Sequence, residues 1–372
     1  MSVFDGIRNP NNEEINYYYP TNDLITAPEI IFFWVARMII AGLEYKKDVP
    51  FKNVYFTGIV RDKLGRKMSK SLGNSPDPIE LIEKYGADGV RMGMLLASPA
   101  GNDLPFDESY CEQGRNFSNK IWNALRLIKS WTVEDIEQPK SSALAIEWFK
   151  EKMNKTLADL EDDFSKYRLS ESLMNVYKFV WDDLCSWYLE IIKPAYQAPI
   201  DRKTFEATLD IFEDVMKILH PFMPFVSEEV YHIIKERKEN DFIMQAQLPA
   251  IKDINTTLLN EFEFIEEFIT AIRSVRNEKN IAQKVALQVY FTKSEEASII
   301  EKYSDIVCKL CNLDTLSSCE EKVEKACCLC VIDCFYCLRH YFVITSYNNN
   351  CYICHFGSTS THRCEGFVAW CI

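Results

Sequence analysis

The spacing of the apolar residues changes once along this chain, near residue 108. Before that point, short β-branched and aromatic runs at residues 23–26 and 53–60 alternate with helical segments, which is typical of α/β structure. After it, apolar residues recur at helical spacing over long segments to about residue 280, which predicts a helical bundle. The two patterns need two kinds of core, so we expect an α/β region followed by an all-α region.

Finer features of the α/β region can also be predicted. Residues 16–19 are a further strand candidate, and residues 30–43, which are apolar all round, predict a buried helix. Asp77 and Pro78 predict the start of a helix that ends at Gly86, because proline suits the first turn and glycine the position just past the end. A short helix is expected at residues 87–96. Later helices are predicted at residues 117–131, 146–160, 170–192, 205–219, 226–234 and 258–275, then a strand at 285–291 and a helix at 296–311.

Composition limits the class of protein. Hydrophobic residues make up 47% and charged residues 26% of the 372 positions, an ordinary balance for a soluble globular protein. No stretch reaches the roughly 18 uninterrupted apolar residues that a membrane span needs, and the first residues do not form a signal peptide. We therefore expect a cytoplasmic protein without membrane contact. The formal net charge of −13 argues against general nucleic-acid binding, although local basic groups can still bind a folded RNA.

The most specific chemical signal is the segment 65–74, Gly-Arg-Lys-Met-Ser-Lys-Ser-Leu-Gly-Asn. Lys67 and Lys70 stand among small hydroxyl residues such as Ser69, and glycines bracket them. Such a loop can close over a polyphosphate, because lysine neutralises phosphate oxygens and glycine allows hinge motion. The alternative is a solvated, lysine-rich surface loop, which the lysines alone would favour.

Residues 67–71, Lys-Met-Ser-Lys-Ser, resemble the second signature of the class I aminoacyl-tRNA synthetases, and the resemblance extends from residue 1 to about 326. Asp77-Pro78, the run 84–88 and Arg91 follow at the family's spacing. The resemblance implies the carboxy-terminal part of a Rossmann-type catalytic domain over 1–108, a helical anticodon-binding domain over 109–284, and a truncated region over 285–326. It also implies ATP and Mg²⁺ as cofactors, catalytic roles for Lys67, Ser69 and Lys70, a structural role for Arg91, and a monomeric enzyme.

Within this class, the run 30–38, Ile-Ile-Phe-Phe-Trp-Val-Ala-Arg-Met, resembles the valyl-tRNA synthetases. These enzymes activate valine with ATP and transfer it to tRNA(Val), and the resemblance implies that Ile30 and Trp34 help line the valine pocket. Such a pair can exclude larger side chains, whereas the alternative is that both residues pack in the core. The family's Gly-x-Asp contact to the ATP ribose is replaced here by Ala-Pro-Glu, so Glu29 would supply the carboxylate. Gly58 is a weaker candidate for close approach of the nucleotide, with a simple strand irregularity as the alternative.

The helical region carries candidates for RNA contact. Residues 115–124 and 272–278 resemble the first and last characteristic helices of the anticodon-binding bundle. Phosphate binding needs exposed cations and polar groups, so the candidates are Arg115, Asn119, Lys120, Arg273 and Arg276. For each residue, the alternative is an ordinary solvated surface position.

One signature of the class is not in this sequence. The upstream His-x-Gly-His motif cannot be present, because the first histidine is His220. ATP binding in a doubly wound fold needs the first strand–helix crevice. We therefore expect that this chain alone does not form valyl-adenylate efficiently. Two other interpretations stay open, namely a non-catalytic tRNA-binding module and the non-functional product of an interrupted gene.

The segment 327–372 differs from the rest of the chain, because it holds nine of the 14 cysteines. Cys334 and Cys337 form one Cys-x-x-Cys pair, and Cys351 and Cys354 form another, a spacing that resembles a zinc ribbon. However, the family resemblance stops just before this segment, and its composition is unlike that of the preceding chain. The alternative, translation in a shifted reading frame without any metal site, is the one that we favour.

Overall fold

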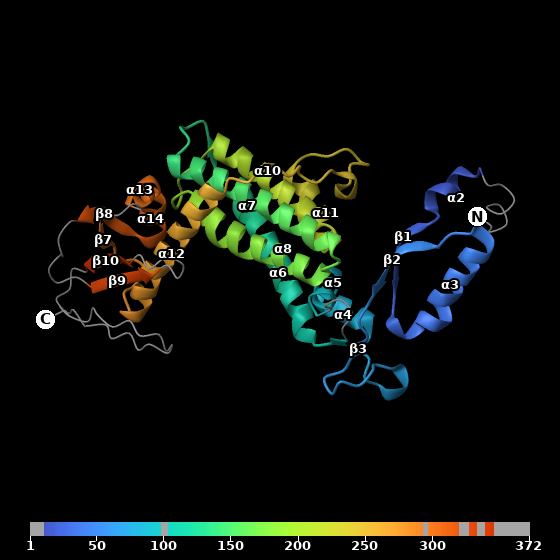
Figure 1. Ribbon diagram of the computed structural model, residues 1–372. Coiled ribbons are helices and arrows are strands. Elements are labelled where there is room, and N and C mark those ends of the chain that lie inside the picture. Colours follow the sequence, from blue (N-terminus) through green and yellow to red (C-terminus); the bar gives the residue numbers. More distant parts are fainter. Residues whose placement is uncertain (1–10, 98–102, 293–296, 320–326, 333–338, 346–372) are drawn as a thin grey trace. The chain divides into compact units, whose positions relative to one another are not determined.

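The computed structural model describes residues 11–97, 103–292, 297–319, 327–332 and 339–345 (Figure 1). The chain divides into two compact units. The first unit comprises residues 1–136, 152–187 and 194–253, and the second comprises residues 137–151, 188–193 and 254–372. Helix α7 (Lys140–Ser165) contributes residues to both units.

The first unit contains a strand–helix–strand crossover. Strand β1 (Thr21–Thr26) runs parallel to β2 (Phe51–Phe56). The connection between them is helical, formed by η1 (Pro28–Ile30), η2 (Ile31–Val35), α3 (Ala36–Ala41) and η3 (Gly42–Lys46). Such crossovers are the building units of parallel α/β sheets. The predicted strand at residues 23–26 is confirmed, whereas the one at 53–60 is divided into β2 and the short β3 (Val60–Arg61).

The prediction of a strand at residues 16–19 is wrong, because this segment belongs mainly to helix α2 (Glu13–Tyr18). The side chain of Asn12 accepts a hydrogen bond from the backbone N–H of Ile15 at 3.0 Å, which caps the helix. Glu13 and Glu14 lie in the first turn, where the helix dipole favours negative charge. These capping signals outweigh the β propensity of the tyrosines.

The prediction of a buried helix at residues 30–43 is also wrong in part, because the segment is helical but largely exposed. Phe32 is 83% exposed and Trp34 is 56% exposed, whereas Val35 is 5% exposed. The only strands beside this crossover among the described residues are β1 and β2. A two-stranded sheet offers too little surface to cover a helix that is apolar all round.

The two helices after the lysine-rich loop confirm their predictions. The side chain of Asp77 accepts a hydrogen bond from the backbone of Ile79 and caps α4 (Pro78–Tyr85). Gly86 ends α4 with φ +77°, a conformation that glycine adopts without strain. Helix α5 (Ala87–Leu96) follows directly, and β4 (Leu104–Pro105) then pairs in parallel with β3.

Long helices form the rest of the chain to residue 278. They are α6 (Glu108–Lys129), α7, α8 (Leu169–Lys178), η5 (Phe179–Tyr188), α9 (Leu189–Ile192), α10 (Arg202–Leu219), α11 (Pro224–Ile234) and α12 (Thr256–Glu278). These helices confirm the predicted helical segments, with α8, η5 and α9 together covering residues 170–192. The remaining short elements are β5 (Val133–Glu134), its parallel partner β6 (Ile200–Asp201), and η6 (Ile243–Gln245).

The contact between α5 and α6 requires glycine. A Cβ atom on Gly114 would lie 2.6 Å from the carbonyl oxygen of Gly89. A Cβ atom on Gly93 would lie 2.7 Å from the backbone nitrogen of Cys111. Larger side chains would separate the two helices, so this crossing joins the α/β part tightly to the first long helix.

The second unit contains a four-stranded sheet in the order β8–β7–β10–β9. The strands are β7 (Leu287–Thr292), β8 (Leu313–Cys319), β9 (Cys327–Ile332) and β10 (Arg339–Thr345). The predicted strand at residues 285–291 is confirmed by β7. The predicted helix at 296–311 consists of two helices, α13 (Ala297–Lys302) and α14 (Ser304–Cys311). Tyr303 separates them with φ −102°, and the hydroxyl group of this buried residue donates to Glu261 at 3.1 Å.

The predicted cysteine pairs of a zinc ribbon, Cys334–Cys337 and Cys351–Cys354, lie outside the described residues. Within the described ranges, there is no group of three or more His, Cys, Asp or Glu side chains that could hold a metal ion. In the same ranges, no helix combines the length and the hydrophobicity that crossing a lipid bilayer needs.

Candidate functional site

The lysine loop (residues 61–74) begins with a tight turn directly after strand β3. The backbone of Asp62 donates to the carbonyl of Arg66 at 2.9 Å, and Arg61 forms an isolated antiparallel bridge with Lys67. Gly65 stands at the turn with φ +74°, a conformation that other residues rarely adopt. This turn places the first signature lysine at the end of a short hairpin.

The carboxylate of Asp62 holds the base of this loop. One oxygen accepts the backbone N–H groups of Leu64 at 3.0 Å and Arg66 at 2.8 Å. The other accepts the side chains of Asn74 at 2.9 Å and Arg66 at 2.8 Å. The hydrogen bond from Asn74 is the main cause that lowers the pKa of Asp62, and the bonds from Arg66 and Leu64 act in the same direction, whereas partial burial opposes them. Asp62 is therefore held as an anion.

The side-chain amide of Asn74 connects the two sides of the loop. Its nitrogen donates to Asp62 and, at 3.3 Å, to the carbonyl of Lys67. Its oxygen accepts the backbone N–H of Ser69 at 2.9 Å. Both ends of one amide therefore fix the backbone of two signature residues.

Lys67 is paired with Glu29, which was predicted from a separate motif. Its ammonium nitrogen lies 2.6 Å from a carboxylate oxygen of Glu29, and both side chains are at least half exposed. The structure therefore brings the predicted pyrophosphate-binding and ribose-binding residues together. An exposed ion pair of this kind is weak, so an anionic ligand can replace the carboxylate.

The remaining signature residues continue the loop. The Ser69 hydroxyl lies 3.1 Å from that of Ser71 and accepts the backbone N–H of Leu72 at 3.3 Å. Lys70 begins the single turn η4 (Lys70–Leu72), and Gly73 follows with φ +62°.

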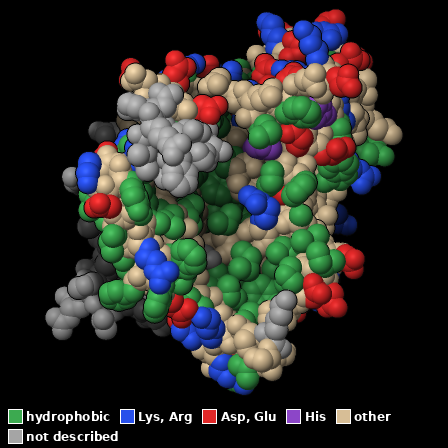
Figure 2. Space-filling view, turned by 90° about the vertical axis from the view of Figure 1, so that its right-hand side faces the viewer, with side chains coloured by type: hydrophobic (Ala, Val, Ile, Leu, Met, Phe, Trp, Pro, Cys, Tyr) green, Lys and Arg blue, Asp and Glu red, His purple; other side chains and the backbone are tan. Residues whose placement is uncertain are grey.

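The two predicted valine-binding residues lie in an exposed part of the crossover. Ile30 ends η1 with φ −107° and is 36% exposed, and Trp34 lies in the π-helical turn η2. The two residues are four positions apart and would share a face in an α-helix, but here the chain passes from a 3-10 turn to a π-helical turn between them. Figure 2 views the molecule from the side of α3 and shows groups of exposed hydrophobic side chains. Gly58 lies in the connection between β2 and β3.

Three of the predicted RNA-contacting residues lie on α6 in the first unit. Arg115 and Asn119 are exposed, and their spacing of four places them on one face of the helix. Lys120 is half-buried, with its ammonium 5.0 Å from the centre of the Trp181 ring. These positions can present cations and a polar group to a phosphate backbone.

The other two predicted RNA-contacting residues, in the second unit, differ from each other. Arg273 is half-buried and donates to the carbonyl of Leu310 at 3.3 Å. Arg276 is only 4% exposed, and burial lowers the pKa of its guanidinium group. It donates to four backbone carbonyls, those of Ala282, Val285, Cys311 and Asn312. This geometry does not support the RNA contact predicted for Arg276, because the group that would bind phosphate is enclosed and joins three chain segments.

Helix α5 carries two side chains that hold the turn before α11. The carboxylate of Asp88 is buried and accepts the backbone N–H groups of Phe225 and Val226 at the start of α11. Arg91 donates to the carbonyls of Pro221 and Phe222, both at 3.2 Å. This arrangement agrees with a structural role for Arg91. Asp88 belongs to the run 84–88 that carries the family resemblance, but its contact with α11 was not predicted.

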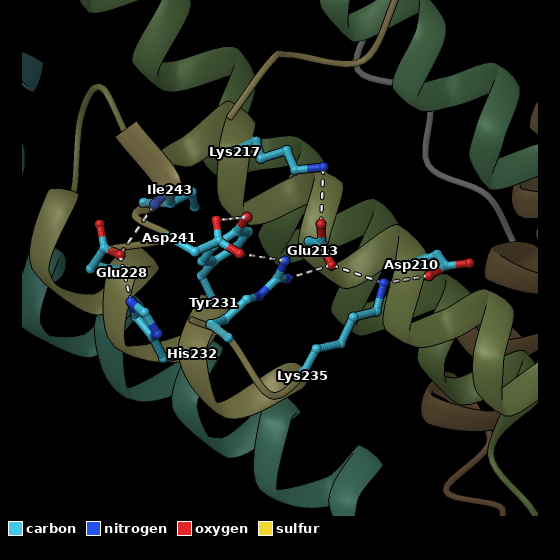
Figure 3. Close-up of polar contacts among 10 residues, drawn as sticks. Asp210, Glu213, Lys217, Glu228, Tyr231, His232, Lys235, Asp241 and Ile243 are labelled. Carbon is cyan, nitrogen blue, oxygen red and sulfur yellow. Dashed lines mark hydrogen bonds and ion pairs between the residues drawn. The ribbon is translucent and has the colours of Figure 1, made fainter. Parts of the chain in front are cut away.

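A cluster of charges between α10 and the end of α11 was also not predicted (Figure 3). Glu213 lies 2.7 Å from Arg237, 2.9 Å from Lys235 and 3.1 Å from Lys217. Burial raises the pKa of Glu213, but the hydrogen bonds from Lys235, Lys217 and Arg237 together outweigh it and lower the pKa to about 2. The guanidinium group of Arg237 also lies over the Tyr231 ring at 3.7 Å. The cluster joins two helices and the following segment.

Comparison with known proteins separates the α/β region before residue 108 from the helical region that follows it. Residues 2–107 match the model of the "tRNA synthetases class I (I, L, M and V)", and residues 147–291 match that of the "Anticodon-binding domain of tRNA ligase". The valine–tRNA ligase of Parabacteroides distasonis is 58% identical over 327 residues, which is 88% of this chain. That of Phocaeicola vulgatus is 59% identical over 324 residues, or 87% of this chain. The chain belongs to the valine–tRNA ligase family.

Membership of the valine–tRNA ligase family confirms the predicted fold class, part of a class I catalytic domain and a helical anticodon-binding bundle. The chain spans 37% of the length of both of these relatives.

Among solved structures, the LeuRS of Agrobacterium radiobacter K84 in complex with tRNA and LeuAMS matches with a TM-score of 0.48 and 18% identity, over 74% of this chain and 30% of that one. Methionyl-tRNA synthetase of Mycobacterium tuberculosis matches with a TM-score of 0.47 and 20% identity, over 60% of this chain and 46% of that one.

Proposed function

We propose that this chain contributes the pyrophosphate-binding loop and the RNA-binding helices of a valine–tRNA ligase. In the first step of that reaction, a carboxylate oxygen of valine attacks the α-phosphorus of ATP, and the bond between that phosphorus and the bridging oxygen breaks. Valyl-adenylate forms and pyrophosphate leaves. In the second step, the 3′ ribose hydroxyl of tRNA(Val) attacks the carbonyl carbon of the adenylate, and AMP leaves.

The observation that carries this proposal is the contact between Lys67 and Glu29 at 2.6 Å. In the proposed site, Lys67 and Lys70 donate to the phosphate oxygens on which negative charge develops as pyrophosphate departs. Glu29 is then free to accept a hydrogen bond from the ribose. Lys67 can bind these phosphate oxygens because its side chain is exposed and a phosphate can replace the Glu29 carboxylate as its partner.

Mg²⁺ would accompany ATP and neutralise part of its phosphate charge. Mg²⁺ keeps several waters and binds through substrate phosphates more than through protein cages. The chain's own contribution is therefore the cationic loop. The chemistry of its donors fits a magnesium-bound polyphosphate, because lysine ammonium groups complement phosphate oxygens as point charges.

Ile30 and Trp34 would bind the side chain of valine. Their exposure leaves them available to a small apolar ligand, and Trp34 offers a rigid wall that excludes longer side chains. A hydroxyl-bearing isostere such as threonine would be rejected only weakly by such a wall. We also propose that the enzyme is cytoplasmic and monomeric.

Valine-dependent exchange between ATP and pyrophosphate tests the catalytic role. The purified chain is compared with a mixture of this chain and a polypeptide that covers the remaining length of the Parabacteroides relative. We expect exchange only in the mixture, and at least a roughly hundredfold loss with Lys67→Ala, because transition-state contacts to developing charge contribute factors of about this size. A matched Lys129→Ala control on α6 should retain the activity. Rapid exchange by the chain alone, or full activity of Lys67→Ala, would contradict the proposal.

A second candidate function is a tRNA-binding module that does not itself form adenylate, and the match of residues 147–291 to the anticodon-binding model favours it. Binding of tRNA(Val) is measured at several salt concentrations. Arg115→Ala or Lys120→Ala should each reduce the slope of log K against log salt by about 1, because each removes one phosphate contact. Binding without exchange activity in the mixture would support the module over the enzyme. Absence of both would leave the chain without either function.

A further inference from the structure

The base of the lysine loop contains a hydrogen-bonded pair of residues to which the family resemblance assigns no role. Asp62 and Asn74 lie on opposite sides of the loop, and Asn74 Nδ2 donates to Asp62 Oδ2 at 2.9 Å. The Asp62 carboxylate is only 12% exposed, although the lysine loop around it is largely solvated. We call this pair the loop lock.

The Asp62 side of the loop lock has no free acceptor position. A carboxylate offers about four lone-pair directions. In the structure, four N–H donors occupy them, from the Leu64 backbone, the Arg66 backbone, the Arg66 side chain and Asn74. A carboxylate with this many donors resists both protonation and displacement.

The Asn74 side requires an amide in one orientation. The oxygen must face the backbone N–H of Ser69, and the nitrogen must face Asp62 and the carbonyl of Lys67. An aspartate at position 74 could still accept from Ser69, but it would place a second carboxylate against Asp62. Like charges at this distance repel each other.

On the basis of the phosphate-binding role proposed above, we infer that Asp62 and Asn74 are positioning residues that fix the backbone of Lys67 and Ser69 before any substrate binds. A preformed loop loses less conformational entropy when it closes on its ligand. The loop lock lies outside the predicted catalytic residues Lys67, Ser69 and Lys70. It acts through the two signature residues whose backbone groups Asn74 holds.

Three variants and a control test the inference through backbone hydrogen exchange of the full chain. Asp62→Asn and Asn74→Asp each create a mismatch, two amide NH₂ groups in the first variant and two carboxylates in the second. The double variant Asp62→Asn/Asn74→Asp restores the hydrogen bond between positions 62 and 74 with the polarity reversed and keeps acceptors for the backbone N–H groups of Leu64, Arg66 and Ser69. It does not restore the bonds to the Lys67 carbonyl and from the Arg66 side chain. Asn277→Asp makes the same chemical change at an exposed position on α12 and serves as the control.

We expect each single variant to accelerate exchange at the N–H groups of Leu64, Arg66 and Ser69 by roughly tenfold, the scale of one lost hydrogen bond. The double variant should return to within about threefold of the natural chain, which is the non-additivity expected of residues in contact. The control should match the natural chain, and the unfolding temperature of the single variants should fall by no more than a few degrees, the shift expected from a loss of about 1–2 kcal/mol. The inference would be overturned if the single variants exchanged at the rates of the natural chain. It would also be overturned if the acceleration in the double variant equalled the product of the accelerations in the two single variants.

A separate titration with inorganic pyrophosphate, followed by ³¹P NMR, distinguishes this inference from the proposed function. Hydrogen exchange alone decides whether the loop lock fixes the loop. Pyrophosphate binding by the natural chain decides whether the loop is a phosphate site. If both hold, the single variants should bind pyrophosphate roughly tenfold more weakly, and the double variant should recover.

Discussion

The ammonium group of Lys67 lies 2.6 Å from the carboxylate of Glu29, although the two residues are 38 positions apart in the sequence. Lys67 belongs to the loop that we propose for the pyrophosphate, and Glu29 to the segment that we propose for the ribose. In the function that we propose, the pair joins two parts of one nucleotide site. In that proposal, the Glu29 carboxylate competes with a bound phosphate for Lys67.

The first prediction concerns this competition. Glu29→Gln removes the competing charge, so the affinity of the chain for inorganic pyrophosphate should rise by up to about fivefold, since an exposed ion pair contributes about 0–1 kcal/mol. Isothermal titration calorimetry with inorganic pyrophosphate measures this affinity. Glu80→Gln, the same change at an exposed position on α4, should leave the affinity unchanged. An unchanged or weaker affinity in Glu29→Gln would show that Glu29 does not restrain Lys67.

Local chemistry explains why part of this site could be predicted from the sequence. The loop residues are contiguous, and the cap of Asp77 and the glycine at position 86 act over a few residues, so their roles follow from the sequence alone. The approach of Glu29 to Lys67 depends on the β1–β2 crossover and could not be deduced from spacing. Asn74 was visible as the last residue of the signature segment, but its function depends on a partner across the loop.

The same reasoning explains the failures. The polarity of Arg276 predicts an exposed cation, but the backbone carbonyls that enclose it come from later segments of the chain, and the local sequence does not reveal them. The apolar run after Glu29 predicted a buried helix, because periodicity reports which faces are apolar and not whether anything covers them. Glu213 has no sequence signal, and the role of Asp88 within the run 84–88 could not be deduced, since both residues depend on partners that are distant in the sequence.

The second prediction uses this difference in exposure. Trp34→Ala should change the free energy of unfolding of the chain by less than about 0.5 kcal/mol, because an exposed side chain makes few packing contacts. Trp148→Ala should cost about 3–5 kcal/mol, since this ring is buried and stacks on Phe262 at a centroid distance of 3.9 Å. Urea unfolding of both variants measures the difference. A large cost for Trp34→Ala would mean that the residue serves the core and not a valine pocket.

The third prediction separates structure from RNA binding at Arg276. Arg276→Lys keeps the charge but cannot reach four carbonyls, so the free energy of unfolding should fall by about 1–3 kcal/mol, the cost of unpaired buried polar groups. Arg202→Lys, at an exposed ion pair with Asp135, should cost less than about 0.5 kcal/mol. The salt dependence of tRNA binding should be the same in a folded Arg276→Gln variant, which removes the charge, and in the natural chain. A reduced slope without loss of stability would restore the RNA contact.

The last prediction concerns Glu213, whose pKa is lowered from the ordinary 4.5 to about 2 in the folded chain. The folded state therefore binds this proton less tightly than the unfolded state. The resulting stabilisation, about 3 kcal/mol, is fully present above pH 4.5 and is lost as the pH falls through about 2.

Glu213→Gln isolates this contribution from the other carboxylates. The difference in unfolding free energy between the natural chain and Glu213→Gln should be large at pH 7 and should shrink between pH 4.5 and 2, because protonation removes the charge that the variant lacks. Glu236→Gln, at an exposed position beyond α11, should show little difference at any pH. A constant difference for Glu213→Gln would mean that the three cations stabilise the fold without their charge, through packing of their side chains alone.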